Sequence, residues 1–164
     1  MDLELRASSA GDVDFVRSCH VAADAAPFIS RWSEADYRAT LEDPDQAHLL
    51  IVGASGPVGF VLLAGLLSEH RGIELRRIVV SEKGQGVGQL ALQLVLEHAF
   101  TTLHAHRVWL DVKVHNQRAQ RAYHAVGFKD EGVLRDTLMT HGKFESLIVM
   151  SILEHEWRTT SPTD

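Results

Sequence analysis

The stretch Lys83-Gly84-Gln85-Gly86-Val87-Gly88 joins a strand-like run, Ile73 to Val80, to an amphipathic helical run, Val87 to Leu103. A glycine-rich turn between a strand and a helix leaves backbone N–H groups uncovered at the positive end of the helix dipole. Phosphate groups bind at such helix starts. The stretch therefore predicts a site for a phosphorylated cofactor.

The spacing of these glycines argues against two common nucleotide sites. A P-loop needs a Gly, four further residues and then Gly-Lys-Ser/Thr, and no Lys-Ser or Lys-Thr follows Gly88. The dinucleotide fingerprint G-x-G-x-x-G opens a repeated strand-helix-strand domain, whereas this turn lies mid-chain and continues into Gln89. The turn thus excludes a P-loop nucleotide triphosphatase and gives little support to a nicotinamide-dependent oxidoreductase.

Length and composition indicate one compact domain. The chain has 164 residues, 45% of them hydrophobic, and a formal net charge of -6. This charge argues against a nucleic-acid-binding surface and is compatible with an amine-bearing substrate. The single Cys19 excludes an intramolecular disulfide framework, and no apolar stretch is long enough to span a bilayer. We expect a cytoplasmic protein that binds neither nucleic acid nor membrane, with one domain over residues 1–158 and a polar tail over 159–164.

Two periodicities alternate along the chain. Apolar or alternating runs predict strands at Leu3 and Leu5, Ala47 to Val52, Val58 to Leu67, Ile73 to Val80, Val108 to Val114, Phe128 to Leu134 and Ser146 to Leu153. Apolar residues at three- and four-residue steps, with capping residues before them, predict helices after Asp12, after Ser33, over Val87 to Leu103 and from Asn116 to Val126. The ten histidines show no metal-ligand spacing, so we expect no metal site.

Several segments in the second half of the chain have the same order and spacing as the sequence motifs of a known family. The glycine turn is followed by Leu110-Asp111-Val112-Lys113-Val114-His115-Asn116, and then by Ala119, Tyr123 and Gly127-Phe128. Together they resemble the acyl-coenzyme-A-binding core of the GNAT acyltransferase superfamily. The closing stretch Glu131-Gly132-Val133-Leu134-Arg135 looks like the branch that contains ribosomal-protein N-terminal acetyltransferases and polyamine acetyltransferases.

The resemblance implies a fold and an activity. The fold is of the α/β (α+β) class, a single domain with a mixed, mostly antiparallel sheet of about seven strands flanked by about four helices. The activity is that of an acetyl-CoA-dependent N-acetyltransferase, which moves an acetyl group to a primary amine by direct attack in a ternary complex. The acceptor would be a small-molecule or peptide amine, and the late strands would allow a homodimer. The alternative is a non-catalytic acyl-CoA-binding regulatory or interaction domain.

The resemblance also implies which residues hold the coenzyme. Backbone groups of three strand residues would bind the pantetheine arm and the thioester oxygen, namely Ile78, Val79 and Val80. The turn and the start of the helix would cradle the pyrophosphate with Lys83, Gly84, Gln85, Gly86, Val87, Gly88 and Gln89. Asn116 would cap the next helix and contact the pantetheine arm, with Ala119 beside it. The family usually carries Arg or Gln where this chain has Lys83.

The same pattern indicates the catalytic groups. Tyr123 matches the family's tyrosine beside the cofactor sulfur, and a phenol with an ordinary pKa of about 10 can donate a proton to a departing thiolate. An alkyl ammonium must also lose a proton, and two acids lie on predicted strands. We favour Glu74, acting through water, and keep Asp111 as the alternative. Phe28 and Trp32 would line the acceptor entrance, where an aromatic ring can hold a cation.

Three other side chains that could take part in catalysis or binding are expected to have structural roles. Cys19 lies far from the motif in sequence and is interpreted as a core residue rather than a nucleophile. Arg76 and Arg77 are expected to form ion pairs rather than to catalyse. Without the family motif, Tyr123 would itself be interpreted as a packed core residue.

Overall fold

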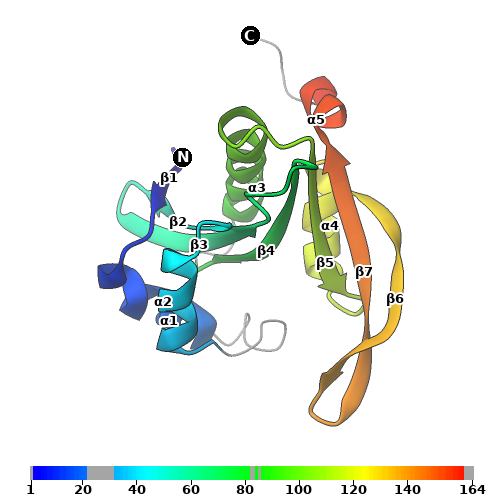
Figure 1. The fold of residues 1–164 in the computed structure, drawn as a ribbon, viewed down its shortest axis with the longest axis horizontal. Helices are drawn as coiled ribbons and strands as arrows, with labels where there is room; N and C mark the ends of the chain where they lie inside the picture. Colours follow the sequence, from blue (N-terminus) through cyan, green and yellow to red (C-terminus); the bar gives the residue numbers. More distant parts are fainter. Residues whose placement is uncertain (1, 22–31, 82–83, 85, 161–164) are drawn as a thin grey trace.

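The molecule is built around one seven-stranded sheet. The computed structural model describes residues 2–21, 32–81, 84 and 86–160. The strands lie in the order β1-β2-β3-β4-β5-β7-β6 (Figure 1). Their bounds are β1 Glu4–Ala7, β2 Gln46–Gly53, β3 Gly56–Ala64, β4 Gly72–Val80, β5 Arg107–Lys113, β6 Lys129–Thr140 and β7 Lys143–Leu153. Neighbouring strands are antiparallel except β4 and β5, which are parallel. The predicted sheet, mixed and mostly antiparallel, is confirmed.

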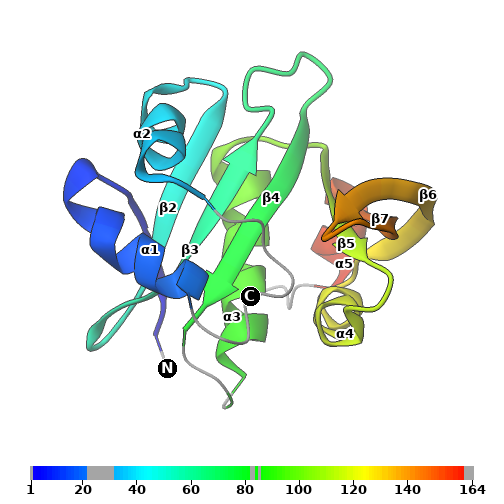
Figure 2. The same ribbon diagram turned by 90° about the horizontal axis from the view of Figure 1, so that it is seen from below.

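Helices cover both faces of this sheet (Figure 2). Their bounds are α1 Val13–Val21, α2 Glu34–Glu42, α3 Val87–Glu97, α4 Gln117–Ala125 and α5 Glu154–Thr160. Because side chains alternate along a strand, successive residues of β2 enter different cores. Leu50 packs with Val16 of α1 and Tyr37 of α2, whereas Leu49 packs with Leu92 of α3. The sheet therefore separates an α1–α2 face from an α3 face.

Capping residues determine where the first helices begin. Ser33 caps α2 as predicted, since its hydroxyl accepts a hydrogen bond from the Asp36 amide at 3.1 Å and the Asp36 carboxylate accepts one from the Ser33 amide at 2.8 Å. Asp12, predicted to cap the first helix, has a different role in the structure. It ends a short 3-10 turn, accepts a hydrogen bond from the Ser9 amide at 2.8 Å and forms an ion pair with Arg6.

Several elements differ from their predicted extent. The helix predicted to reach Leu103 is α-helical only to Glu97 and continues as a π turn, His98–Thr102. The closing strands are longer than predicted and form a two-stranded arm that extends from the sheet (Figure 1). A fifth α-helix, α5, follows β7 and contains the first two residues of the predicted polar tail, while residues 161–164 lie outside the described part. Trp157 of α5 stacks on Phe100 with a centroid distance of 5.3 Å, which anchors this short helix.

No helix among the described residues combines the length and apolar character needed to cross a bilayer.

Candidate active site

The parallel strands β4 and β5 separate partway along their length. Their register runs from Gly72 opposite Arg107 to Glu74 opposite Trp109 and ends there, so the two strands form a fork (Figure 1). Beyond the fork β4 remains paired with β3 on its other edge, up to Val80 opposite Gly59. One edge of β4 therefore offers backbone N–H and C=O groups to a ligand lying between the strands.

The three strand residues predicted to bind the pantetheine arm lie on this part of β4. Val79 is buried in the core beneath α1 and α2, while Ile78 and Val80 pack against the core on the α3 face. Their side chains are thus committed to packing. Only their backbone groups remain for the role that the sequence predicted.

The glycine turn ends in an uncapped helix start. Gly86 is the N-cap of α3 in the left-handed conformation, with φ of 76°, and no side chain in the described part of the chain caps the helix. A Cβ atom added at Gly84, Gly86 or Gly88 would meet no atom within 4 Å, so the space around the turn is open. The amide groups of the first turn, including those of Gly88 and Gln89, suit a phosphate group. Lys83 and Gln85, predicted for the same cradle, lie outside the described residues.

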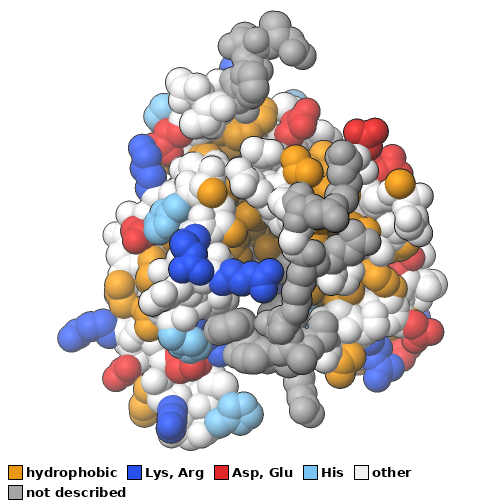
Figure 3. Space-filling view, turned by 180° about the vertical axis from the view of Figure 1, so that it is seen from behind, with side chains coloured by type: hydrophobic (Ala, Val, Ile, Leu, Met, Phe, Trp, Pro, Cys, Tyr) orange, Lys and Arg blue, Asp and Glu red, His pale blue; other side chains and the backbone are white. Residues whose placement is uncertain are grey.

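A space-filling view of the side opposite to Figure 1 shows lysine and arginine side chains beside a hollow with hydrophobic side chains in its floor (Figure 3). An anionic ligand with an apolar arm requires both surface types.

Helix α4 positions the predicted acid. Asn116 is its N-cap, and the side-chain oxygen accepts a hydrogen bond from the Ala119 amide at 3.2 Å. Tyr123, two turns further along, packs against the core, with its ring centroid 5.7 Å from that of Phe128. Burial, and after it the negative charge of Asp111, raises the pKa of Tyr123 to about 12. The phenol therefore stays protonated at neutral pH.

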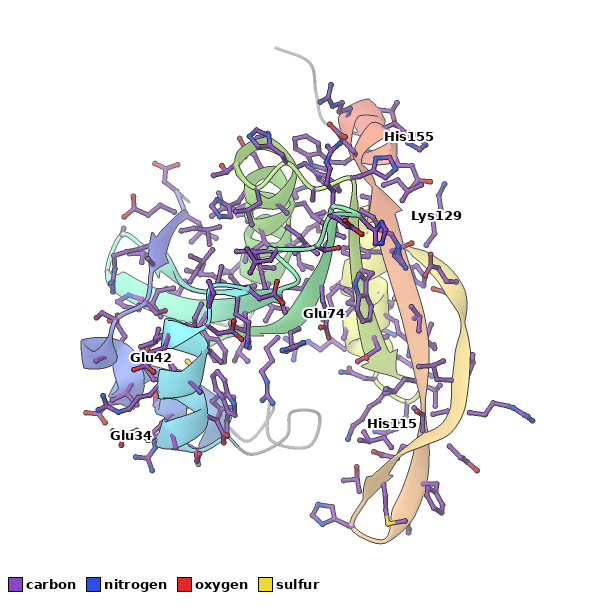
Figure 4. All side chains as sticks on the ribbon, in the orientation of Figure 1. Glu34, Glu42, Glu74, His115, Lys129 and His155 are labelled. Carbon is purple, nitrogen blue, oxygen red and sulfur yellow. The ribbon has the colours of Figure 1, made fainter. Side chains whose placement is uncertain are left out.

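The two predicted bases differ in their surroundings. Glu74 lies at the fork (Figure 4) and accepts hydrogen bonds from Arg76 Nη2 at 2.8 Å and Arg76 Nε at 3.1 Å. Asp111 lies on β5, two residues beyond the last paired position. Desolvation raises its pKa, the charge of Glu74 raises it further, and Arg76 acts in the opposite direction. The structure thus holds Glu74 in an ion pair, as predicted for Arg76, and leaves Asp111 exposed on β5 with a raised pKa.

Among the described residues, no group of three or more His, Cys, Asp or Glu side chains is arranged to hold a metal ion. Phe28, predicted for the acceptor entrance, lies outside these residues.

Trp32, the other predicted entrance residue, belongs to an aromatic cluster that the sequence did not reveal. Its indole stacks on His48 with a centroid distance of 5.8 Å, and His48 stacks on Phe60 at 5.1 Å. The guanidinium carbon of Arg77 lies 5.1 Å from the centroid of the Trp32 ring, a cation–π contact. The α1–α2 face of the sheet thus carries an aromatic cluster with an arginine in contact with it.

His48 is the most deeply buried polar member of this cluster. Its Nδ1 lies 2.6 Å from Ser8 Oγ, and its Nε2 has no hydrogen-bond partner among the described residues. Burial, and after it the charge of the nearby His20, lowers the pKa of His48 to about 4. The ring is therefore neutral at neutral pH and acts as an aromatic packing element.

A model of the acetyltransferase (GNAT) family matches residues 19–128, about two thirds of the chain and the whole fork and glycine turn. The chain belongs to the GNAT family. This confirms the resemblance stated from the sequence, and with it the prediction that the enzyme is an acetyl-CoA-dependent N-acetyltransferase.

Three relatives of this GNAT protein illustrate the range of similarity. A spermidine N(1)-acetyltransferase of Vibrio cholerae is 26% identical over 171 residues, covering 97% of each chain. An uncharacterised N-acetyltransferase of Mycobacterium tuberculosis is 32% identical over 123 residues, 74% of this chain and 77% of the relative. The crystal structure of a Vibrio cholerae spermidine N-acetyltransferase with CoA and spermine has a TM-score of 0.85 at 24% identity, covering 95% of this chain and 98% of the other.

Proposed function

We propose that the enzyme acetylates a primary amine by direct attack on acetyl-CoA held in the β4–β5 fork, with Asp111 as general base and Tyr123 as general acid. The observation that carries this assignment is the position of Asp111, which lies on β5 two residues beyond the point where β4 and β5 separate. Tyr123 lies on α4, the helix that follows β5, and the negative charge of Asp111 acts on its phenol in addition to burial.

The protein groups divide the work between binding and proton transfer. The unpaired edge of β4 and the amides at the start of α3 hold the coenzyme. Acetyl-CoA supplies an activated acyl group when bound. Asp111 takes a proton from the acceptor ammonium, directly or through water, and so frees the nitrogen lone pair. The Tyr123 hydroxyl donates its proton to the sulfur as the carbon–sulfur bond breaks.

Glu74 would tune this site rather than act as its base. It is held by Arg76 and faces the same side of the sheet as Asp111, since it lies opposite Trp109 and side chains alternate along β5. Its negative charge keeps the pKa of Asp111 raised, which brings that carboxylate nearer to the working pH.

Transfer through an acyl-enzyme has no support from the one cysteine. Cys19 is buried in the core under α1 and α2, and burial raises the pKa of its thiol. A buried thiol of raised pKa is a poor nucleophile. Direct attack in a ternary complex is the mechanism that the described residues fit.

The acceptor class is an amine, as the names of the Vibrio cholerae spermidine N-acetyltransferases state for those proteins. The alternative, a binding domain without turnover, is disfavoured because the fork carries both a protonated phenol and a basic carboxylate. A homodimer formed through the late strands, the absence of a nucleic-acid partner and a cytoplasmic location stay predictions.

A thiol-release assay with an amine panel tests the proposal. Free CoA should appear only when an amine is added, and Tyr123→Phe should lower kcat by roughly 10²- to 10⁴-fold while leaving acetyl-CoA affinity nearly unchanged. Gln117→Ala, which changes an exposed residue of α4 with no assigned role, is the control on this helix and should cost far less in kcat. Release of CoA without amine, or an equal loss of binding and turnover in Tyr123→Phe, would contradict the assignment.

A further inference from the structure

The strands β5, β7 and β6 extend the sheet beyond the helices that cover its α1–α2 face. Helices α1 and α2 pack on β2, β3 and β4, and Figure 1 shows β5, β7 and β6 farther along the sheet. On the opposite face Val108 and Leu110 of β5 are buried in the core that α3 and α4 cover. Because side chains alternate along a strand, Trp109 and Asp111 project from the face that α1 and α2 leave open here.

An apolar strip surrounds Asp111 on this open face. Val149 of β7 lies opposite Asp111. Leu147 follows on the same face of β7, and Trp109 precedes Asp111 on the same face of β5. Trp109, Val149 and Leu147 are each partly buried, and none of them packs in a hydrophobic core of the described residues. They therefore form an apolar surface, the Trp109 strip, that is separate from the cores.

Ion pairs close both ends of the Trp109 strip. At one end Arg107 Nη2 lies 2.7 Å from Glu131 Oε2, and at the other Lys113 Nζ lies 2.9 Å from Glu145 Oε2. The charges at each end are thus matched by their own partners. A second ammonium group of an acceptor would find no unpaired carboxylate at these described ends and would lose water on an apolar surface. An alkyl or aryl group would instead bury apolar area there.

The position of the proposed base identifies the occupant of the strip. Asp111 lies within it, so a molecule that rests on Trp109 and Val149 also rests against the carboxylate that takes the proton. The strip is therefore continuous with the reaction centre. Of its three apolar residues, Trp109 has the largest and most rigid side chain, and its ring can stack on an aromatic group.

We propose that the Trp109 strip binds the apolar body of the acceptor, so that the enzyme prefers primary amines that carry an aryl or long alkyl group over diamines and polyamines. The reacting nitrogen then lies at Asp111, and the group attached to it lies along β5 and β7. Trp109 is the residue that sets this specificity. The inference rests on the proposed function, because it concerns the acceptor of the same reaction.

Acceptors of matched size provide the test. We would compare ethylamine with 2-phenylethylamine, and hexylamine with 1,6-diaminohexane, by kcat/KM for CoA release at fixed acetyl-CoA. In the wild type 2-phenylethylamine should exceed ethylamine by about 10- to 100-fold, since a phenyl group leaves water. Hexylamine should exceed the diamine by about 10-fold or more, since the second ammonium must be desolvated.

Variants separate the role of Trp109 from a general loss of activity. Trp109→Ala should lower kcat/KM for 2-phenylethylamine by about 10-fold or more and change that for ethylamine much less, whereas Trp109→Phe should keep most of the preference. Phe144→Ala is the control, because Phe144 is an exposed aromatic residue of β7 whose position places it on the opposite face from Leu147. Thermal unfolding with and without acetyl-CoA shows that each variant folds and binds the coenzyme.

The outcomes distinguish the two proposals. A wild type that prefers the diamine, or a Trp109→Ala variant that lowers kcat/KM for all four amines equally, would overturn the acceptor strip and leave the acetyltransferase proposal standing. The strip would also be wrong if Trp109→Ala dissociated an oligomer in sedimentation and left the order of acceptors unchanged, since a second copy would then cover it. A wild type that binds acetyl-CoA but acetylates no amine would overturn the proposed function, and the inference with it.

Discussion

At the residue scale, the two carboxylates near the fork have different partners: Glu74 is paired with Arg76, and Asp111 has a raised pKa. Glu74 and Asp111 are of similar chemistry, and both lie on strands that meet at one point. Arg76 distinguishes them, because its guanidinium holds Glu74 at 2.8 Å. The charge on Glu74 then acts on Asp111 and raises its pKa. Catalytic carboxylates with raised pKa values arise in this way in many enzymes.

Glu74→Gln should shift the acid limb of the pH–rate profile to lower pH. The base must be deprotonated to act, so kcat/KM falls as the pH drops through its pKa. Removing the charge of Glu74 lowers the pKa of Asp111, and Arg76, released from its partner, would lower it further. The measurement is kcat/KM for one amine from pH 5 to pH 9.

Two comparisons control this experiment. Glu69→Gln removes a carboxylate whose side chain is 88% exposed and should leave the profile unchanged. Asp111→Asn should lower kcat by about 10²-fold or more, since the base itself is lost. If Glu74→Gln instead abolishes turnover at every pH while Asp111→Asn is mild, Glu74 is the base, as the sequence first indicated.

The parts of the candidate site that lie in short sequence motifs were predictable, whereas the parts formed by contacts between distant residues were not. A local pattern with fixed spacing contains Asn116, Tyr123 and the glycines. In the structure Asn116 caps α4, Tyr123 lies two turns further along that helix, and the glycines lie at the start of α3. The contacts of Trp32 with His48 and Arg77 join residues from separate parts of the chain. Their spacing in the sequence does not predict these contacts. Long-range packing of this kind is not encoded in periodicity.

At the element scale, β4 is shaped by its neighbours on both sides. It carries the bulge at Arg76, leaves β5 at the fork, and is pressed against β3 at its far end. Gly59 of β3 makes the last contact possible. A Cβ atom at this position would lie 2.2 Å from the carbonyl oxygen of Val79 and 3.1 Å from the Cα of Val80. The position therefore requires glycine, although its backbone conformation is not left-handed.

Gly59→Ala should destabilise the protein by about 3 kcal/mol or more, because the added methyl group must displace the β4 backbone rather than a flexible side chain. Chemical denaturation measures the free energy of unfolding. The displaced residues, Val79 and Val80, are also those proposed to bind the pantetheine arm, so acetyl-CoA affinity should fall as well. Gly72→Ala in β4 is the control, since a Cβ atom there meets nothing within 4 Å. Equal stability of the two variants would show that β3 and β4 are not held in this close contact.

The elements that the sequence did not predict share a physical cause. Helix α5 is seven residues long and mostly polar, so its own pattern is weak, and it depends on the stacking of Trp157 on Phe100. The distal half of β6 is exposed and lacks apolar alternation, and it forms a strand because β7 pairs with it. Both elements are stabilised by partners distant in sequence. Elements with a buried apolar face were predicted more closely: the bounds of β3 lie within three residues of the prediction, and α3 begins at the predicted Val87.

At the scale of the whole molecule, His48 and His20 make the free energy of unfolding depend on pH. His48 has an ordinary pKa of 6.5 in the unfolded chain and about 4 in the folded protein. The unfolded state therefore binds more protons between these values, and stability falls as the pH drops from 6.5 toward 4. The full difference corresponds to about 3 kcal/mol. Burial also lowers the pKa of His20, which acts in the same direction.

His48→Asn should flatten this pH dependence while lowering stability at pH 7.5, because the aromatic stack is lost. The free energy of unfolding, measured in urea at several pH values between 7.5 and 4.5, gives the slope directly. His70→Asn serves as the reference, since the His70 side chain is 87% exposed and should not change the slope. An identical slope in His48→Asn and wild type would show that His48 titrates normally in the folded state.

Coenzyme binding should act on the stability of the whole molecule through the start of α3. A ligand present at 100 times its Kd adds about 2.7 kcal/mol, which for a chain of this length raises Tm by roughly 5–10 °C. Gly88→Asp places a carboxylate in the first turn of α3, where it interacts favourably with the helix dipole but repels a pyrophosphate. The variant should therefore keep or slightly raise its own Tm and lose most of the shift caused by acetyl-CoA.

Gly88→Ala separates charge from bulk at the same position. A Cβ atom there meets no atom within 4 Å, so this variant should fold normally and retain most of the acetyl-CoA shift. Differential scanning fluorimetry with and without acetyl-CoA compares the three proteins. Because Asp stabilises the helix start while it weakens ligand binding, the two effects have opposite signs, and a variant that had merely unfolded could not produce both. A Gly88→Asp protein with the full wild-type shift would place the pyrophosphate elsewhere than at the first turn of α3.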